Sequence, residues 1–383
     1  MDIYMDNSAT TKVADEVKEI VLKVMTEDFG NPSSKHIKGV EAEKYIKDAK
    51  QIIASSLKVK DKEIFFTSGG TESNNLAIIG AANAYKRSGN HIITSKIEHP
   101  SVINPFVYLE EQGFDVSYVG VDSQGHIDEE ELKSLLRPDT ILVSFMMTNN
   151  EVGATQDVKR LVDIIRENNK ATIIHVDAVQ AYAKYKIFPS KWGVDLLSVS
   201  GHKLHGPKGI GFLYIKEKTK IKPIILGGNQ QDGIRSGTEN VPGIAGLGLA
   251  AKLAYEGFDE KIAHMREIRD FMSKEFAGIE GVSVNNETGD NAPHIVSASF
   301  EGVKSEVFLH SLEDKGIYVS SGSACSTHKR APSGTLVALG VKKELLDCTL
   351  RFSLCDENTM DEAKYVVEAV KELYPKLKLF RHY

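Results

Sequence analysis

The stretch TILVSFMM at residues 140–147 decides the class of fold. It is almost entirely apolar, which is typical of a strand buried on both faces of a sheet that helices cover. Similar short runs lie on either side of it along the chain, with helical patterns between most of them. We predict strands at residues 63–67, 91–96, 116–119, 140–147, 172–176, 195–199 and 210–215. This alternation predicts an α/β fold with a mostly parallel, seven-stranded sheet, and an antiparallel member where no helix separates the last two runs.

The sequence changes in character after Gly237. We predict a helix at 241–255, a charged helix at 259–276, a Gly- and Asn-rich loop at 278–291, further strands, and a terminal helix at 360–376. This pattern indicates a second, smaller α+β domain that the N-terminal arm completes. We therefore expect a large domain at 16–256 and a small domain made of 1–15 and 257–383, with a mobile loop near 320–335.

Composition excludes several classes of protein. The 383 residues carry a formal net charge of −6 and no long run of one sign, whereas a nucleic-acid binder usually presents a basic face. No stretch of 18 apolar residues exists, so we expect no membrane-spanning helix. Three cysteines are too few and too irregular for a disulfide scaffold, which favours a reducing, cytoplasmic location.

Polar clusters follow several of the predicted strands, where sites form in open α/β sheets. The motif SGGTES at residues 68–73 lies between a strand and a helix, and it fits neither a Walker loop nor the dinucleotide fingerprint. Its glycines and helix N-terminus suit an anion such as phosphate. Plain capping of the helix explains the same residues equally well.

Three single residues follow other strands. Asp177 comes directly after TIIHV and either faces a ligand cation or caps the next helix. Lys203 lies in SVSGHKLHGPKG at residues 198–209, a turn that suits a lysine for Schiff-base chemistry. His99, in EHPS, is by itself more typical of a structural histidine.

Two further residues carry candidate chemistry in the second half of the chain. Cys325 lies in VSSGSACST at 319–327, a run of small polar residues that can expose a thiol. By contrast, Cys348 and Cys355 flank the apolar run TLRFSL and are typical of small core residues; the three cysteines do not have the spacing of a zinc site. Arg351 lies inside that run and needs a carboxylate partner, either structural or from a substrate.

Taken in order, these motifs resemble the cysteine desulfurases of the NifS/IscS type, in the class V group of fold-type I pyridoxal phosphate enzymes. The resemblance covers essentially the whole chain. The motifs are YMDNSATT (4–11), GNPSS (30–34), TSGGTESNN, EHPS, TNNEVGATQD, HVDAVQ, SGHKLHGPKGIG, RSGTEN, SSGSACST and LRFSL. A departure is GGNQQD at 227–232, where the family has GGGQE, so we expect altered local contacts there but no loss of the cofactor.

The resemblance implies roles for these residues around pyridoxal 5'-phosphate. Lys203 holds the cofactor as a Schiff base and moves the Cα proton of the substrate. Asp177 pairs with the pyridine nitrogen, while His99 stacks on the ring and is a candidate acid–base group. Gln180 and Asn150 lie near the ring's 3-oxygen. The residues implied to hold the phosphate are Gly70, Thr71, Ser200, His202 and Thr238, the last of them contributed by the partner subunit of a homodimer.

The implied reaction converts L-cysteine to L-alanine. Arg351, with Asn150, binds the substrate carboxylate, and Cys325 attacks the substrate sulfur and keeps it as a persulfide. A sulfur acceptor protein, such as an iron–sulfur scaffold or a tRNA thiolation protein, then takes the sulfur. We expect no resident metal, although Cys325 is a candidate transient iron–sulfur ligand, and no direct contact with nucleic acid or membrane.

Alternatives stay open within and outside this group. A selenocysteine lyase or another class V enzyme, such as an aminotransferase, would use the same cofactor residues without needing Cys325. A regulatory scaffold with a degenerate site is less consistent with the sequence, because Lys203, Asp177, His99 and Arg351 are all present. An NAD enzyme is excluded because the fingerprint glycines are missing.

Overall fold

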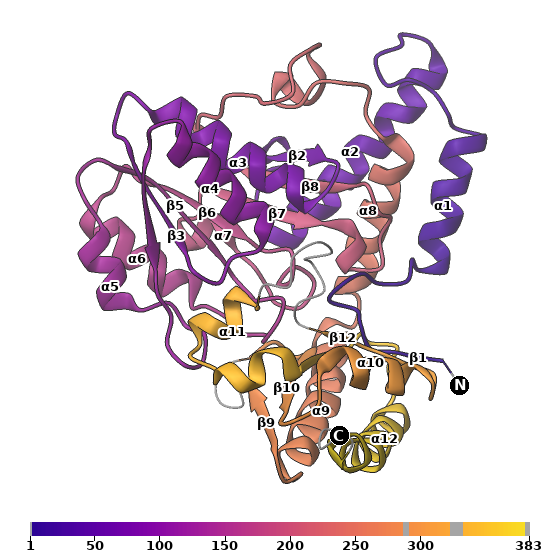
Figure 1. Ribbon diagram of the computed structural model, residues 1–383. Helices are drawn as coiled ribbons and strands as arrows, with labels where there is room; N and C mark the ends of the chain where they lie inside the picture. Colours follow the sequence, from indigo (N-terminus) through magenta and orange to yellow (C-terminus); the bar gives the residue numbers. More distant parts are fainter. Residues whose placement is uncertain (1, 286–290, 322–331, 380–383) are drawn as a thin grey trace.

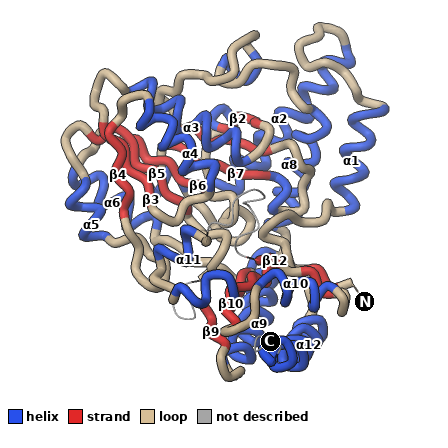
Figure 2. The backbone as a smooth tube through the Cα atoms, viewed as in Figure 1, coloured by secondary structure: helices blue, strands red, loops and turns tan. Residues whose placement is uncertain are grey.

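The computed structural model describes residues 2–285, 291–321 and 332–379, so Cys325 lies outside the described residues. A seven-stranded sheet forms the centre of the larger part (Figures 1 and 2). Its order is β2-β8-β7-β6-β5-β3-β4. The strands are β2 (Ile64–Thr67), β3 (His91–Ser95), β4 (Asp115–Val119), β5 (Thr140–Met146), β6 (Ile173–Asp177), β7 (Leu196–Ser200) and β8 (Gly211–Ile215).

The direction of the strands confirms the predicted mixed sheet. β3, β4, β5, β6 and β7 pair in parallel, while β8 is antiparallel to both of its neighbours. The predicted strand ends were wrong by a residue or two, because Asp177 and Ser200 are the last residues of β6 and β7 and do not follow them. Met146 pairs with Asp177, and Asp177 pairs with Ser198, so the carboxyl ends of the parallel strands β5, β6 and β7 lie side by side.

Helices cover both faces of this sheet because alternate strand residues point to opposite sides. Ile174 and Val176 belong to the core shared with α1, α2, α6 and α8, whereas Ile173 belongs to the core shared with α3 and α4. Helices α1 and α2 are not among the predicted elements. The helices are α1 (Asp15–Thr26), α2 (Ile37–Leu57), α3 (Gly70–Tyr85), α4 (Pro100–Glu111), α5 (Glu129–Leu135), α6 (Val158–Asn168), α7 (Pro189–Trp192) and α8 (Val241–Tyr255).

A second, smaller sheet and its helices form the lower part of Figure 1. Its antiparallel order is β12-β13-β10-β9, and its core includes Phe276, Phe300 and Phe352. The strands are β9 (Val282–Asn285), β10 (Ile295–Phe300), β12 (Ser320–Ser321) and β13 (Thr349–Ser353); the helices are α9 (Phe258–Ala277), α10 (Ser305–Glu313), α11 (Gly334–Ala338) and α12 (Met360–Leu379). Part of the loop predicted at 278–291 is therefore strand β9, at the edge of the sheet. Its pairing with β10 stabilises it, and the Gly- and Asn-rich composition of the segment gives no local signal for a strand.

The N-terminal arm packs against this smaller part. β1 (Ile3–Tyr4) pairs in parallel with β11 (Ile317–Tyr318), and Met5 is buried in the same core. The arm then crosses to the large sheet, where the Thr11 amide donates to the carbonyl of His202. The domain limits at residues 16 and 256 stay a prediction. Within the described residues, no helix is long and apolar enough to cross a membrane.

Candidate active site

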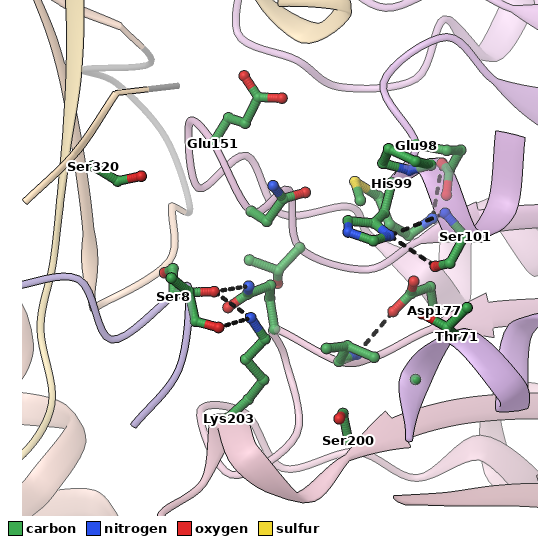
Figure 3. Close-up of a pocket in the computed structure, with 18 of the residues that line it drawn as sticks. Ser8, Thr71, Glu98, His99, Ser101, Glu151, Asp177, Ser200, Lys203 and Ser320 are labelled. Atoms are coloured by element: carbon green, nitrogen blue, oxygen red, sulfur yellow. Dashed lines mark hydrogen bonds between the residues drawn. The ribbon is translucent and has the colours of Figure 1, made fainter. Parts of the chain in front are cut away.

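A cavity of about 440 Å³ opens at the carboxyl ends of β5, β6 and β7 (Figure 3). Most of the predicted site residues line it: Gly70, Thr71, His99, Asn150, Asp177, Gln180, Ser200, His202, Lys203 and Arg351. Thr238 is exposed and does not line this cavity of its own chain. Cys325 lies outside the described residues, although Ser320 and Ser321, shortly before it in sequence, are at the cavity wall. The fold thus gathers residues that are far apart in the sequence around one space.

Lys203 lies in a 3-10 turn, Gly201–Lys203, directly after β7. Its Nζ donates hydrogen bonds to the backbone carbonyls of Ser8 and Ala9 (2.7 Å to Ala9 O). Gln180 Nε2 donates to the same Ser8 carbonyl at 3.0 Å. The N-terminal arm therefore holds the amine at the cavity, as Figure 3 shows for Ser8 and Lys203.

Asp177 is a buried carboxylate whose hydrogen-bond donors in the described part of the chain are both neutral. Oδ1 accepts from the Val179 amide at 2.9 Å, and Oδ2 accepts from Asn74 Nδ2 at 2.8 Å. Burial raises the pKa of Asp177, while the two donors and the nearby His99 and Lys203 act in the opposite direction. Such a carboxylate suits a ligand that brings its own N–H⁺ group, because no residue in the described part of the chain forms an ion pair with it.

His99 is the N-cap residue of α4, with Pro100 in the first turn. Its Nδ1 accepts from the Ser101 amide at 3.1 Å and lies 2.8 Å from Ser101 Oγ. Burial lowers the pKa of His99, with a smaller contribution from Lys203 in the same direction, and Asp177 opposes both. The ring points toward the cavity in Figure 3. His99 is therefore part of the site and has a structural role as a cap as well.

The SGGTES motif forms the start of α3 at one end of the cavity. Gly69 is the N-cap residue with φ +148° and no side-chain cap, so capping alone does not explain the motif. A Cβ on Gly70 would lie 2.9 Å from Val179 Cγ2. Thr71, Ser200 and His202 line the adjoining space, where the first-turn amides of the helix have no helical partner. Burial, with Lys203 and Lys208, lowers the pKa of His202 to about 4. This end of the cavity suits an anion such as phosphate.

Arg351 has the carboxylate partner that the sequence required. Nη2 donates to Asp6 Oδ1 at 2.7 Å, and Nη1 donates to the Asn150 carbonyl at 2.8 Å. Its Nε is buried and has no hydrogen-bond partner within the described residues. The partner is thus structural in this state of the chain, and an incoming carboxylate competes with Asp6 for the same guanidinium.

Sequence reasoning missed several residues of the cavity. Asp6 and Ser8 come from the N-terminal arm, and the carboxylates of Glu98 and Glu151 also line the wall. Burial raises the pKa of Glu98 to about 8, and its Oε1 accepts from Ser95 Oγ and from the Met146 amide. Burial also raises the pKa of Glu151, which accepts from Ser333 and Thr335. The position of Glu98 directly before His99 at a strand end was the available signal.

The GGNQQD segment makes its contacts away from this cavity, and the expected difference from the family's contacts stays a prediction. Gln231 Oε1 accepts from the Phe66 amide at 2.9 Å, and its Nε2 donates to Glu239 at 3.2 Å. Gln230 Oε1 accepts from the Gly237 amide at 3.0 Å. These glutamines therefore fix the segment that carries Thr238.

A second cavity, of about 230 Å³, lies beside α1, α8 and α9. Asp356 is its central group, with Oδ2 3.3 Å from Lys261 Nζ and Oδ1 3.5 Å from His205 Nε2. Cys355 lies in the same cluster, and the buried Lys184 lines the cavity. Cys348 and Cys355 are both buried, as predicted.

Comparison with known proteins places the chain in a family. The model of the family "Aminotransferase class-V" matches residues 3–366. The cysteine desulfurase IscS of Dictyoglomus turgidum is 42% identical over 383 residues, which are all of this chain and 97% of that protein. The IscS of Methanosarcina thermophila is 44% identical over 98% of this chain and 93% of its own length. The chain belongs to the class V aminotransferases and, within them, to the cysteine desulfurases of the NifS/IscS type, which confirms the predicted resemblance.

Solved structures agree with this assignment. A NifS-like protein superposes with a TM-score of 0.93 at 38% identity, covering 98% of this chain and all of the other. The protein SspA, solved in complex with cysteine, has a TM-score of 0.79 at 35% identity and covers 92% of this chain and 99% of its own. The predicted fold class, fold-type I, is thereby confirmed.

Proposed function

We propose that this chain converts L-cysteine to L-alanine and holds the released sulfur as a persulfide on Cys325. The observation that carries the proposal is the single cavity around which Lys203, Asp177, His99 and Arg351 converge, in a chain of the cysteine desulfurase family. SspA, a structural relative, was solved with cysteine, which supports a cavity of this kind as a site for the amino acid.

The residues present fit pyridoxal 5'-phosphate. Asp177, held by neutral donors, offers its charge to the pyridinium nitrogen, and His99 offers a ring face for stacking. Gly70, Thr71, Ser200 and His202 offer the anion-binding end of the cavity, and Thr238 of the partner subunit completes it in our proposal. Gln180 and Asn150, which line the cavity, would lie near the 3-oxygen of the cofactor ring. When bound, the cofactor acts as an electron sink for the substrate Cα.

Side chains of the protein carry out the remaining steps of the proposed reaction. Arg351 binds the substrate carboxylate after this carboxylate displaces Asp6 from Nη2, and Asn150 lies beside it. Lys203 releases the carbonyls of Ser8 and Ala9, binds the cofactor and moves the proton at the substrate Cα. Cys325, as thiolate, attacks the substrate sulfur, so the C–S bond breaks and the sulfur stays on the enzyme.

A homodimer and a sulfur acceptor complete the proposed function. Large apolar side chains are exposed on and between α1 and α2, namely Leu22, Met25, Phe29, Ile37 and Val40, which supports an interface between subunits. The acceptor is a protein such as an iron–sulfur scaffold or a tRNA thiolation protein. We propose a cytoplasmic location because the three cysteines lack the pattern of a secreted, disulfide-bonded chain.

The test measures alanine and sulfide from L-cysteine with dithiothreitol as reductant. The intact protein and the variants Cys325→Ala and Cys348→Ala are compared, all loaded with pyridoxal phosphate. We expect equal amounts of both products from the intact protein and from Cys348→Ala, and almost none from Cys325→Ala. Full activity of Cys325→Ala would contradict the sulfur relay and favour the alternative, a selenocysteine lyase. No alanine from any cofactor-loaded protein would contradict the proposed substrate.

A further inference from the structure

Asn74 connects two groups of the cavity from behind. It lies on α3 and is fully buried, and its Nδ2 donates to Asp177 Oδ2 at 2.8 Å and to Ser101 Oγ at 2.9 Å. A carboxylate only accepts hydrogen bonds, so the amide nitrogen of Asn74 must face Asp177. Both amide hydrogens are thereby used, one for each neighbour.

This arrangement fixes the direction of the next hydrogen bond. Ser101 Oγ accepts from Asn74, so its single hydrogen is available for His99 Nδ1 at 2.8 Å. The Ser101 amide donates to the same Nδ1 at 3.1 Å. Two donors thus converge on Nδ1, which must carry a lone pair and no hydrogen. In a neutral imidazole, the proton then lies on Nε2.

The surroundings keep the ring neutral. Burial lowers the pKa of His99, and the positive charge of Lys203 acts in the same direction. Asp177 favours the charged ring, but its carboxylate already accepts from Val179 and Asn74. Glu98, on the segment before His99, is itself a buried carboxyl group with a pKa raised to about 8. A neutral ring with its proton on Nε2 can donate a hydrogen bond and has no free lone pair.

We infer that Asn74 and Ser101 are positioning residues that fix His99 as the neutral Nε2–H tautomer, so that His99 donates a hydrogen bond and does not act as a base. The inference deepens the proposed function and rests on it for the reaction concerned. It assigns proton removal to Lys203 and leaves His99 to stack on the ring and to hold a hydrogen-bond acceptor of the ligand. It also explains why an amide, with its two donors, occupies position 74.

The test uses the cofactor-loaded protein with ¹⁵N-labelled histidine and reads the two ring nitrogens of His99 by NMR, assigned with His99→Asn. We expect the signature of an unprotonated Nδ1 and a protonated Nε2 from pH 6 to 8. In Asn74→Asp, the new carboxylate attracts the Ser101 hydroxyl, and we expect a population with protonated Nδ1 to appear. Asn75→Asp is the matched control, because Asn75 Nδ2 donates to Thr71 O within α3.

Two results would overturn the inference: a protonated Nδ1 in the unmodified protein, or an unchanged His99 signature in Asn74→Asp. Should Asn74→Asp not fold, Ser101→Ala replaces it, with a smaller shift expected because alanine removes one donor to Nδ1 but offers no acceptor for a proton on Nδ1. Asn74→Asp is also expected to lower kcat for L-cysteine about tenfold, less than the roughly hundredfold loss of a group that itself transfers the proton. The NMR result needs no turnover, so failure of the proposed reaction is recognised separately.

Discussion

Two cavities of this molecule, of about 440 and 230 Å³, contain the same kinds of residue in different electrostatic settings. Lys203, His99 and Asp177 line the larger one, while Lys184, His205 and Asp356 line the smaller one. Asp356 is compensated by the chain itself, with Lys261 at 3.3 Å and His205 at 3.5 Å. These groups and Lys184 lower the pKa of Asp356 against the effect of its burial.

In the larger cavity Asp6 pairs with Arg351, whereas the buried carboxyl groups of Asp177 and Glu98 have no ion-pair partner among the described residues. Among the described residues, Asp177 accepts hydrogen bonds from two neutral donors, and Glu98 Oε2 is buried without a hydrogen-bond partner. A carboxylate that the fold does not neutralise costs stability and is available to a ligand cation. Residue types alone therefore do not mark a site, whereas a buried charge that the chain leaves without an ion-pair partner does.

The largest expected effect is the difference in alanine formation between a variant of Lys203, in the larger cavity, and a variant of Lys184, in the smaller one. Lys203→Ala is expected to lower alanine formation by about 10³-fold or more, because it removes both the covalent attachment and the proton-moving amine. Lys184→Met, at the buried lysine of the smaller cavity, is expected to keep activity within about threefold. Alanine production under saturating L-cysteine measures both. Comparable losses in the two variants would contradict the distinction between the cavities.

The next effect separates the two aspartates. Asp177→Asn is expected to lower kcat about 10²-fold, since the neutral amide no longer stabilises a pyridinium, while the thermal midpoint stays the same or rises. The cofactor's absorption spectrum should change with it, which a purely structural residue would not cause. An active Asp177→Asn protein with an unchanged spectrum would show that the carboxylate does not pair with the cofactor.

His175 lies two residues before Asp177 on β6. Its ring is buried between Ser144 and Ser198, and burial lowers its pKa from 6.5 to about 3. Between pH 6.5 and 3 the His175 ring is therefore protonated in the unfolded chain but neutral in the folded chain. The free energy of unfolding is thus highest above pH 6.5 and decreases as the pH falls toward 3. At pH 5 the contribution of His175 lowers the free energy of unfolding by about 2 kcal/mol relative to its value well above pH 6.5.

Urea unfolding between pH 7.5 and 5 tests this expectation. His175→Gln should flatten the dependence of the unfolding free energy on pH, whatever it does to the absolute value. His310→Gln, at an exposed position on α10, is the surface control. The same pH slope in His175→Gln and in the unmodified protein would exclude His175 as its source.

The smallest expected effect belongs to the smaller cavity. Asp356→Asn is expected to destabilise the fold by about 1–2 kcal/mol, a value kept low because the carboxylate is partly exposed, and to leave kcat unchanged. In a Lys261→Met background the loss should shrink, since the cation that Asp356 compensates is then missing. Additive losses in the double variant would contradict the ion pair as the cause.

The sequence by itself determined the alternation of strands and helices, because hydrophobic periodicity and strand-end motifs are local signals. It also placed Asp177, Lys203, His99 and Arg351 at the ends or inside of strands, and the ordered motifs pointed to the family. Local signals failed for β9, which only its pairing with β10 stabilises, and for helices α1 and α2.

Only the tertiary structure decided which charges meet. Asp6 reaches Arg351 across 345 residues of sequence, and Ser8 reaches Lys203 across 195. The sequence around Asn74, inside a helix, and around Ser101, directly after a proline, gives no sign of a role in the site. In the structure these two residues connect Asp177 to His99 through hydrogen bonds. The physical reason is that hydrogen bonds and ion pairs depend on distances of about 3 Å, which chain topology sets and sequence spacing does not.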